Sequence, residues 1–432
     1  MGPKKQNIYN SNSDIISYLP GNILEKILMC LPIQVAVRTS ILSRKWRYVW
    51  RKLPQLVFDD TFCRGLHGPT HTKMLMIIYQ VMLLHRGPIT KFALSMIGLK
   101  GCPQIDPLIL NVSNNDIHDF TLCIGSAEPY KLPSSLYSCS RLMHLTLRSC
   151  VLKPPPGFEG FTRILSLNLC DVVISADVLS SLISSCPLLE DLTLRSSTSL
   201  DSLDVVGPNL KSVFCLGNFK SICFSNTPHL ASVELFHNKG EISSSVVLLD
   251  SVPAIEHLGL DCTYVKGIAA CGVPTRLPTA LNNLKKISLH EICFSKRDEV
   301  SVLICLIRSS PNLEDVTIYA CPRPTSASTI GLDFSDVHGC SDVSLNQLRR
   351  VNMKTLSGTK PELEFVKLML AKSPMLETML IELRSQNVAD ELGIVKELTR
   401  LRRASPVAEM HFARSEEDES SDDDDDDDDD DG

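Results

Sequence analysis

A short hydrophobic pattern recurs through most of the chain. Apolar side chains occupy positions i, i+3 and i+5, as in Leu142, Leu145 and Leu147, and the pattern occurs thirteen times. Its first positions are Leu53, Ile89, Ile117, Leu142, Ile164, Leu189, Leu210, Leu230, Ile255, Leu284, Leu313, Leu348 and Leu376. The second and third positions of each triplet have the alternation of a β-strand with one buried face. The pattern therefore predicts a series of short strands.

The triplets also recur at a regular distance. From Leu142 to Leu313 successive triplets start 20 to 29 residues apart, which is the period of leucine-rich repeats. Several triplets follow, at an offset of two residues, a proline that ends the preceding segment: Pro187, Pro208, Pro228, Pro253, Pro311 and Pro374. Predicted helices span 176–185, 298–309 and 362–372, and an amphipathic helix spans 70–86. We expect the shorter repeats to turn without a full helix.

These features predict an α/β fold. Stacked repeats would place their strands in a parallel ladder on the concave face of a leucine-rich-repeat solenoid, with helices on the other side. Outward residues of the ladder, such as Thr146, Asn168 and Thr193, would then be available to a ligand.

The stretch from Leu19 to Lys52 follows a different, helical pattern. Apolar residues at helical spacing come after Pro20, namely Ile23, Leu24, Ile27, Leu28 and Leu31. Pro32 ends this helix, and shorter helices fit 34–40 and 43–52. Such a small bundle is too short to be stable by itself. We therefore expect it to pack on the following repeats, on a partner protein, or on both.

Composition and charge divide the chain further. The formal net charge of −7 becomes +7 when the 14 acidic residues between Glu416 and Asp431 are set aside, so the body is only mildly basic. That charge does not indicate a nucleic-acid-binding protein. Residues 320–346 lack the repeat pattern and are predicted to form a long loop. The predicted boundaries are a disordered N-terminus at 1–17, the helical bundle at 18–52, repeats at 53–346, C-terminal repeats with a cap at 347–405, and an acidic disordered tail at 406–432.

Neither a membrane span nor a catalytic motif is present in the sequence. The longest apolar run, 74–84, is shorter than the ~20 residues that cross a bilayer. The 16 cysteines include no Cys-x-x-Cys pair, and the absence of a secretory signal favours reduced, intracellular cysteines. No phosphate-binding loop or hydrolase motif occurs. His67 and His71 are four residues apart, but in a Gly/Pro-containing stretch that does not suit metal ligation. We expect no enzyme activity, cofactor, metal or membrane association.

The bundle resembles an F-box. The resemblance rests on Leu19-Pro20, Leu31-Pro32, Arg38-Thr39-Ser40, Leu42-Ser43 and the pair Trp46 and Trp50. The stretch 53–59 is similar to the first strand that follows the F-box in plant F-box/LRR proteins, and 348–381 is similar to the FBD domain of that family. One segment departs from the plant pattern, because Ile33-Gln34-Val35 replaces a helix cap and an acidic first-turn residue. Each of those features contributes ~1 kcal/mol or less, so we expect weaker binding to an adaptor.

The resemblance implies the substrate-recognition subunit of an SCF-type (Skp1–cullin–F-box) ubiquitin ligase, a non-catalytic role. The F-box would bind a Skp1-like adaptor, and through it a cullin, while the repeats bind an unidentified substrate protein. By analogy the adaptor contacts would come from Leu19, Pro20, Ile23, Leu24, Leu28, Leu31, Pro32, Val37, Leu42, Trp46 and Trp50. Cations at 44, 45, 47, 51 and 52 would steer an acidic partner. The expected location is the nucleus, the cytoplasm or both.

The alternative is a stand-alone leucine-rich-repeat scaffold without a role in ubiquitination. In that case the N-terminal helices merely cap the repeats, and deleting residues 1–52 would unfold them. A docking module predicts that the repeats stay folded.

Overall fold

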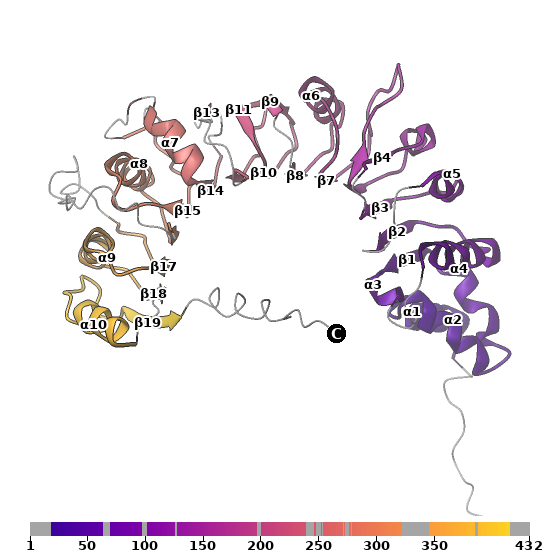
Figure 1. The fold of residues 1–432 in the computed structure, drawn as a ribbon, viewed down its shortest axis with the longest axis horizontal. Coiled ribbons are helices and arrows are strands. Elements are labelled where there is room, and N and C mark those ends of the chain that lie inside the picture. The colour runs from indigo at the N-terminus through magenta and orange to yellow at the C-terminus, as the bar shows by residue number, and fades with distance from the viewer. Residues whose placement is uncertain are drawn as a thin grey trace, which may run out of the picture. The chain divides into compact units, whose positions relative to one another are not determined.

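The chain folds into two compact units in a computed structural model (Figure 1). The first unit runs to residue 174 and includes 185–189, and the second comprises 175–184 and the chain from 190 onward. The structure describes residues 19–63, 70–96, 102–125, 128–196, 200–238, 246–247, 252, 254–270, 272, 276–277, 279–321, 345–384 and 388–414. The predicted disordered N-terminus, residues 322–344 of the predicted loop, and the tail from 415 lie outside these ranges.

The N-terminal bundle is built from short helices that share a small core. They are α1 (Gly21–Met29), α2 (Ile33–Arg38) and two 3-10 helices, η2 (Thr39–Ile41) and η3 (Trp46–Lys52). Leu24, Leu28, Ala36, Trp46 and Trp50 fill its interior. Pro20 and Pro32 stand at the N-caps of the first two helices, where the missing N–H has no cost. Three helical segments were predicted, but the third is a 3-10 helix.

The first unit continues with a parallel strand ladder. In the described residues its order is β1, β2, β3, β5, β7. These strands are β1 (Gln55–Asp59), β2 (Lys91–Met96), β3 (Asp119–Ile124), β5 (His144–Arg148) and β7 (Ser166–Cys170). The connecting elements are α3 (Asp60–Cys63), α4 (His71–Leu84), η4 (Pro103–Ile105), α5 (Asp106–Ser113), η5 (Ser134–Ser138), and the paired short strands β4 (Tyr130–Lys131) and β6 (Cys150–Val151).

The second unit carries its own parallel ladder. The described strands follow the order β8, β10, β12, β14, β15, β16, β17, β18, β19. They are β8 (Asp191–Arg195), β10 (Ser212–Leu216), β12 (Ser232–Phe236), β14 (His257–Asp261), β15 (Lys286–Ile292), β16 (Asp315–Ala320), β17 (Arg350–Leu356), β18 (Thr378–Leu383) and β19 (Glu409–Arg414). The helices are α6 (Ala176–Ser184), α7 (Cys262–Ala270), α8 (Arg297–Arg308), α9 (Lys360–Lys372) and α10 (Val388–Thr399).

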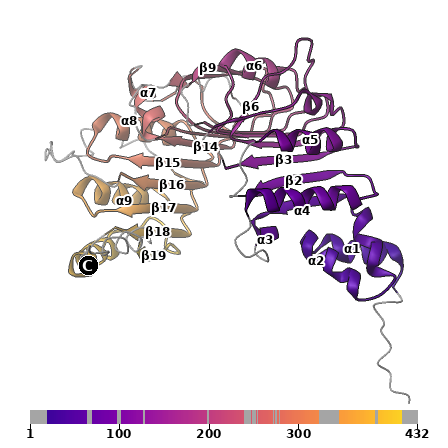
Figure 2. The ribbon, with the colours of Figure 1, turned by 45° about the vertical axis from the view of Figure 1, so that its right-hand side comes forward.

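In each unit the helices cover one face of the ladder (Figure 2). Every residue of the thirteen predicted triplets points toward the covered side and is at most 3% exposed. The alternate side chains point to the other side, which we call the open face. The predicted α/β fold with a parallel ladder is therefore confirmed, and its core is the stack of triplets.

The prolines before the triplets occupy tight turns. The backbone N–H of Leu189, Leu210, Leu230, Leu313 and Leu376 donates to the carbonyl three residues earlier, at 3.1 to 3.4 Å. Proline is thereby the second residue of the turn, where its fixed φ is favourable. Each turn reverses the chain and aims the next strand into the ladder.

Several connecting segments differ from the prediction. In the described residues the shorter repeats between β8 and β14 have no helix, as predicted, but they contain additional strands. Strands β9 (Leu200–Val206), β11 (Phe219–Ser225) and β13 (Val246–Val247) form a separate three-stranded parallel sheet. Alternating apolar residues of β9 and β11, such as Leu203, Val205 and Ile222, bury one side of it. Helices α5, α7 and α10 were not predicted. Helices α4, α6, α8 and α9 match predicted helices.

The predicted start of the disordered tail at residue 406 is wrong. Residues 409–414 form β19, which pairs with β18 so that Met410 and Phe412 lie opposite Met379 and Ile381. The sequence signal for this strand was Ser405-Pro406, which matches the Ser373-Pro374 turn of the preceding repeat. Ser405 is buried, and its hydroxyl donates to the Leu376 carbonyl at 2.7 Å.

Candidate functional site

Exposed apolar side chains are concentrated in the N-terminal bundle. Of the seventeen large hydrophobic residues exposed in the described chain, seven lie between Leu19 and Lys52. We call them the N-terminal patch: Ile23, Ile27, Met29, Val35, Ile41, Leu42 and Tyr48. Ile41 is 87% exposed and Leu42 is 64% exposed. Because such surfaces mark protein-interaction sites, the patch is the leading candidate for a docking surface.

The structure divides the predicted adaptor-binding residues into two groups. Leu24 and Leu28 are fully buried, and Trp46 and Trp50 are 3% and 4% exposed, all inside the bundle. These four side chains form the bundle core in this structure, and their contact with an adaptor stays a prediction. The remaining residues keep exposed or half-buried side chains: Leu19, Pro20, Ile23, Leu31, Pro32, Val37 and Leu42.

Sequence reasoning missed five members of the patch. Ile27 lies four residues after Ile23 on the same face of α1, so helical spacing was a usable signal for it. Met29, Val35, Ile41 and Tyr48 had no such signal, because the sequence does not show which apolar side chains the small bundle encloses.

The bundle is strongly basic. Between Leu19 and Lys52 it carries seven lysines and arginines and a single acidic residue, Glu25. All of the cations except Arg51 are classed as exposed. Exposed apolar side chains on a basic bundle suit an acidic partner, since complementary charge raises the association rate.

The second helix starts without the features that stabilise helix starts. Pro32 is its N-cap, no side chain accepts from its first N–H groups, and its first turn has no acidic residue. The residues that differ from the plant F-box pattern make other contacts. Ile33 is buried, and Gln34 Nε2 donates to the Thr61 carbonyl at 2.6 Å. Gln34 thereby ties α2 to α3 in the first repeat.

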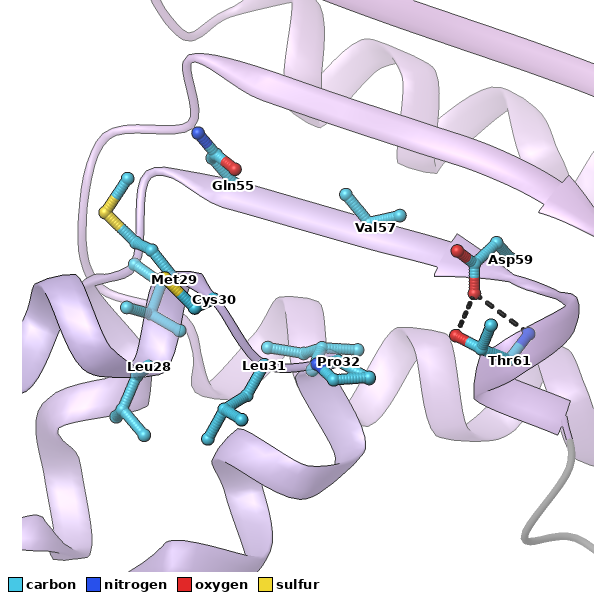
Figure 3. A pocket seen from close by; sticks show the side chains of 11 residues that line it. Leu28, Met29, Cys30, Leu31, Pro32, Gln55, Val57, Asp59 and Thr61 are labelled. Atoms are coloured by element: carbon cyan, nitrogen blue, oxygen red, sulfur yellow. Dashed lines mark hydrogen bonds between the residues drawn. The ribbon is translucent and has the colours of Figure 1, made fainter.

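A pocket of about 360 Å³ lies where the bundle meets the first strand (Figure 3). Its walls come from the turn between α1 and α2 and from the outward side chains of β1, including Leu31, Pro32, Gln55 and Val57. Asp59 closes one end, where it accepts from the backbone N–H and hydroxyl of Thr61 at 3.0 and 2.5 Å. The pocket is mostly apolar, with a few polar groups at the rim.

The bundle and the first repeat are joined by close backbone contacts. The Arg51 carbonyl accepts from Arg86 and Gly87 at 2.8 and 3.2 Å, and His85 Nε2 lies 2.8 Å from the Leu53 carbonyl. A Cβ at Gly87 would come within 2.8 Å of the Lys52 backbone. Burial lowers the pKa of His85 although the Leu53 carbonyl opposes the shift. The bundle is thus an integral part of the first unit.

The predicted substrate-binding residues lie on the open faces. Thr146 and Asn168 are cross-strand partners on β5 and β7, and Thr193 occupies the same position on β8. All three are half-buried. Their position is as predicted, and their role remains a proposal.

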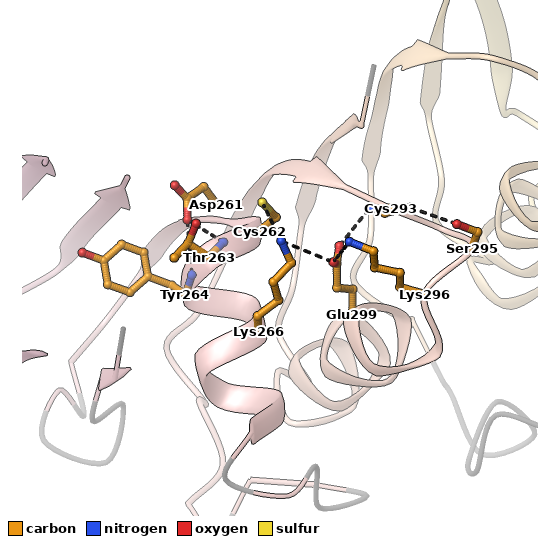
Figure 4. A network of polar contacts seen from close by, with 9 residues as sticks. All are labelled: Asp261, Cys262, Thr263, Tyr264, Lys266, Cys293, Ser295, Lys296 and Glu299. Carbon is orange, nitrogen blue, oxygen red and sulfur yellow. Dashed lines mark hydrogen bonds and ion pairs between the residues drawn. The ribbon is translucent and has the colours of Figure 1, made fainter. Parts of the chain in front are cut away.

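A polar cluster of the second unit has a structural role (Figure 4). Glu299 is 1% exposed, accepts from the Cys293 N–H at 2.9 Å, and pairs with Lys296 and Lys266 at 3.4 and 3.8 Å. Lys266 also lies 3.5 Å from Cys262 Sγ. Burial raises the pKa of the Cys262 thiol despite that lysine, so the thiol is a poor nucleophile. The cluster ties α7 and α8 to β15.

The described residues contain neither a metal-binding cluster nor a membrane-spanning helix. No group of three or more His, Cys, Asp or Glu side chains gathers in a way that suits a metal ion. No described helix is long and apolar enough to cross a bilayer. His67 lies outside the described residues. His71 Nε2 lies 3.4 Å from Cys102 Sγ.

Comparison with known proteins identifies both parts of the chain. The F-box domain model matches residues 16–58, and a model described as the LRR repeats of FBD-associated F-box protein At5g56370 matches residues 105–318. F-box/FBD/LRR-repeat protein At1g13570 of Arabidopsis thaliana is 38% identical over 92% of this chain and 98% of its own length. FBD-associated F-box protein At5g56370, also of Arabidopsis thaliana, is 26% identical over 92% of this chain and 100% of its own length.

Proposed function

This chain belongs to the family of F-box/FBD/LRR-repeat proteins, and from that premise we propose that it is the substrate-recognition subunit of an SCF-type ubiquitin ligase. In this proposal the N-terminal bundle binds a Skp1-like adaptor, which connects it to a cullin. The repeats hold the protein that is to be ubiquitinated. The chain itself contributes recognition and positioning, and catalysis belongs to other subunits. Reduced cysteines fit a location in the nucleus or the cytoplasm.

The observation that carries the proposal is the N-terminal patch. A bundle that served only as a cap would bury its apolar side chains against the first repeat. This bundle keeps Ile41 and Leu42 largely exposed, at 87% and 64%, while Trp46 and Trp50 form its core. The exposed residues are therefore assigned to the adaptor, and the buried ones to the rigid support that positions them.

Adaptor binding is tested best with substitutions in the patch. Purified full-length protein with Ile23→Asp and Leu42→Asp should lose capture of a Skp1-like adaptor in a pull-down, because both changes place a carboxylate in an apolar contact. Val407→Asp is a matched control, since Val407 is 66% exposed and lies in the second unit. It should bind like wild type. A folded wild-type chain that captures no adaptor would contradict the proposal.

The structure also changes how the rival scaffold hypothesis is tested. Deleting residues 1–52 would remove Arg51, which accepts from Arg86 and Gly87, and would uncover Leu53. The repeats would lose support under either hypothesis, so that deletion no longer separates them. Leu24→Asp and Trp46→Ala have the same weakness because both residues are buried. The patch substitutions avoid it.

A further inference from the structure

The open face of the second ladder carries a row of aromatic rings. Phe214 on β10, Phe236 on β12, His290 on β15 and Tyr319 on β16 follow one another across the strands. Their ring centroids are separated by 5.6, 4.7 and 4.1 Å in turn, and the His290 and Tyr319 rings are stacked at 20°. We call these four residues the ring row. All four are half-buried.

A cation stands at each end of the ring row. The Arg195 guanidinium lies 4.6 Å from the Phe214 centroid, and Lys354 Nζ lies 5.1 Å from the Tyr319 centroid. Lys354 has an ion-pair partner at the distance limit, Glu382 at 4.0 Å. In the described part of the chain no carboxylate pairs with Arg195. The rings thus lie between two positive charges.

Strand β14 lies beneath the row without adding a ring to it. Gly259 has no side chain, and a Cβ there would come within 2.9 Å of Glu234 Cγ. Asp261 is buried, and its carboxylate accepts from the backbone N–H groups of Thr263 and Tyr264 at the start of α7. Asp261 is the register partner of His290, and the rings of Phe236 and His290 meet across this strand.

The His290 ring at the centre of the row is neutral. Burial, with a smaller effect from Lys354, lowers the pKa of His290 to about 4, so this ring is neutral at physiological pH. Beside the row, Ser288, Thr317 and Asn352 are register partners on β15, β16 and β17. Ser288 and Asn352 are half-buried and present short uncharged polar groups, which can hydrogen-bond the main chain of an extended ligand. Thr317 is buried, and its hydroxyl accepts from Asn352 Nδ2 at 3.2 Å.

We propose that the ring row is a docking surface for an extended segment of a partner protein, in which an aromatic or aliphatic side chain is flanked by carboxylates. The apolar side chain packs on the rings, as anchors in protein interfaces do. Its carboxylates meet Arg195 and Lys354. This inference rests on the proposed function, because it names the class of substrate segment that the repeats hold.

A protein segment fits this surface better than a single-stranded nucleic acid. Proteins that bind single strands combine aromatic platforms with a positively charged groove that follows the backbone. Here two cations stand over rings of the row, and Glu234 and Glu382 lie on the same face. Two end charges match two acidic side chains rather than a continuous phosphate chain.

The first unit supplies a matched control for Arg195. Strands β5 and β8 share the sequence Leu-Thr-Leu-Arg, which ends at Arg148 and at Arg195. Both arginines are exposed. Arg148, however, pairs in register with Cys123 and Cys170, and Asn168 stands where the second unit has Phe214.

The test begins with a phage-displayed library of random peptides selected on the full-length chain. Enriched peptides should carry an aromatic or large aliphatic residue between acidic residues. Synthetic copies should bind wild type, and Arg195→Gln and Tyr319→Ala should each weaken binding by about tenfold, the effect of losing an interface anchor. Arg148→Gln should leave the affinity unchanged. Arg195 is exposed, so its substitution remains informative even if Tyr319→Ala disturbs folding.

Several results would overturn the inference. They are selection of basic peptides, failure to obtain any peptide that depends on Arg195, equal weakening by Arg148→Gln, or displacement of the peptides by a single-stranded oligonucleotide that binds more tightly. Adaptor capture is measured on the same samples. A wild-type chain that captures the adaptor but fails these tests refutes the ring row alone, and one that captures no adaptor refutes the proposed function.

Discussion

The two ladders share one architecture and differ in what their open faces carry. In the first unit the outward residues of the strands are small or polar, such as Ala93, Thr121 and Asn168. In the second unit the corresponding face carries the ring row and its flanking cations. The inward triplets are equally buried in both. Inward positions therefore specify the repeat fold, while outward positions can change their chemistry without changing it.

The largest effects should come from inward positions, and should be alike in both units. Leu147→Ala and Leu289→Ala each remove a fully buried side chain. Each should lower the free energy of unfolding of its unit by ~2–5 kcal/mol through lost burial and the cavity left behind. Denaturant unfolding followed by circular dichroism measures the loss. Thr146→Ala on the open face is the control. A small effect in only one unit would show that the two cores are not equivalent.

Removing a helix cap should destabilise the two units by different amounts. Asp59 accepts from the Thr61 and Phe62 N–H groups, and Asp261 accepts from those of Thr263 and Tyr264 and, in addition, of His237. Asp59→Ala should cost ~1 kcal/mol, the usual loss for an N-cap. Asp261→Ala should cost ~2 kcal/mol or more, because it also leaves the backbone N–H of His237 unsatisfied. The additional donor of Asp59 is the Thr61 hydroxyl, which can rotate toward another acceptor. Thermal unfolding compares the two, and equal losses would contradict the distinction.

The smallest effect concerns the cation over the ring. Arg195 and Phe214 should show a coupling of ~0.5–1 kcal/mol in a double-mutant cycle built from Arg195→Gln and Phe214→Leu, as expected for an exposed cation–π pair.

The first unit allows this contact to be created. Asn168 faces Thr146 as Phe214 faces Thr193, so Asn168→Phe places a ring beside Arg148. The same cycle on Arg148 should show no coupling in the wild-type background and a similar coupling with Phe at 168. No coupling in either unit would mean that the Arg195–Phe214 geometry contributes no measurable energy.

The docking surface at the N-terminus shows where sequence reasoning reached its limit. Helical spacing placed Ile23 and Leu24 side by side as candidate contacts, yet Ile23 is 36% exposed and Leu24 is fully buried. Trp46 and Trp50 suit an interface by residue type, but the bundle uses both as core. Ile41, the most exposed apolar residue there, was not singled out. Hydropathy ranks side chains by transfer cost, and that cost is the same for a core and for an interface.

The ladder was predictable because its signals are local. A strand with one buried face needs alternating apolar residues, and a tight turn before it favours proline, so both can be recognised within ten residues. The same turn signal at Ser405-Pro406 predicts β19. The predicted start of the tail was nevertheless placed before this strand because of the acidic residues that follow it. Strands β9 and β11 were not predicted because their alternating apolar residues lie outside the triplets.

The sequence by itself determined the period of the repeats, the inward residues of each strand and the helical bundle at the N-terminus. Tertiary structure decided which apolar residues of the bundle stay exposed and which outward residues meet. Phe236 and His290 are 54 positions apart in the sequence, and their rings lie 4.7 Å apart. That contact depends on the register of successive strands, in which the partner of His290 on β14 is Asp261 and not an aromatic residue. Local periodicity carries no information about a neighbour that only the stacking of repeats creates.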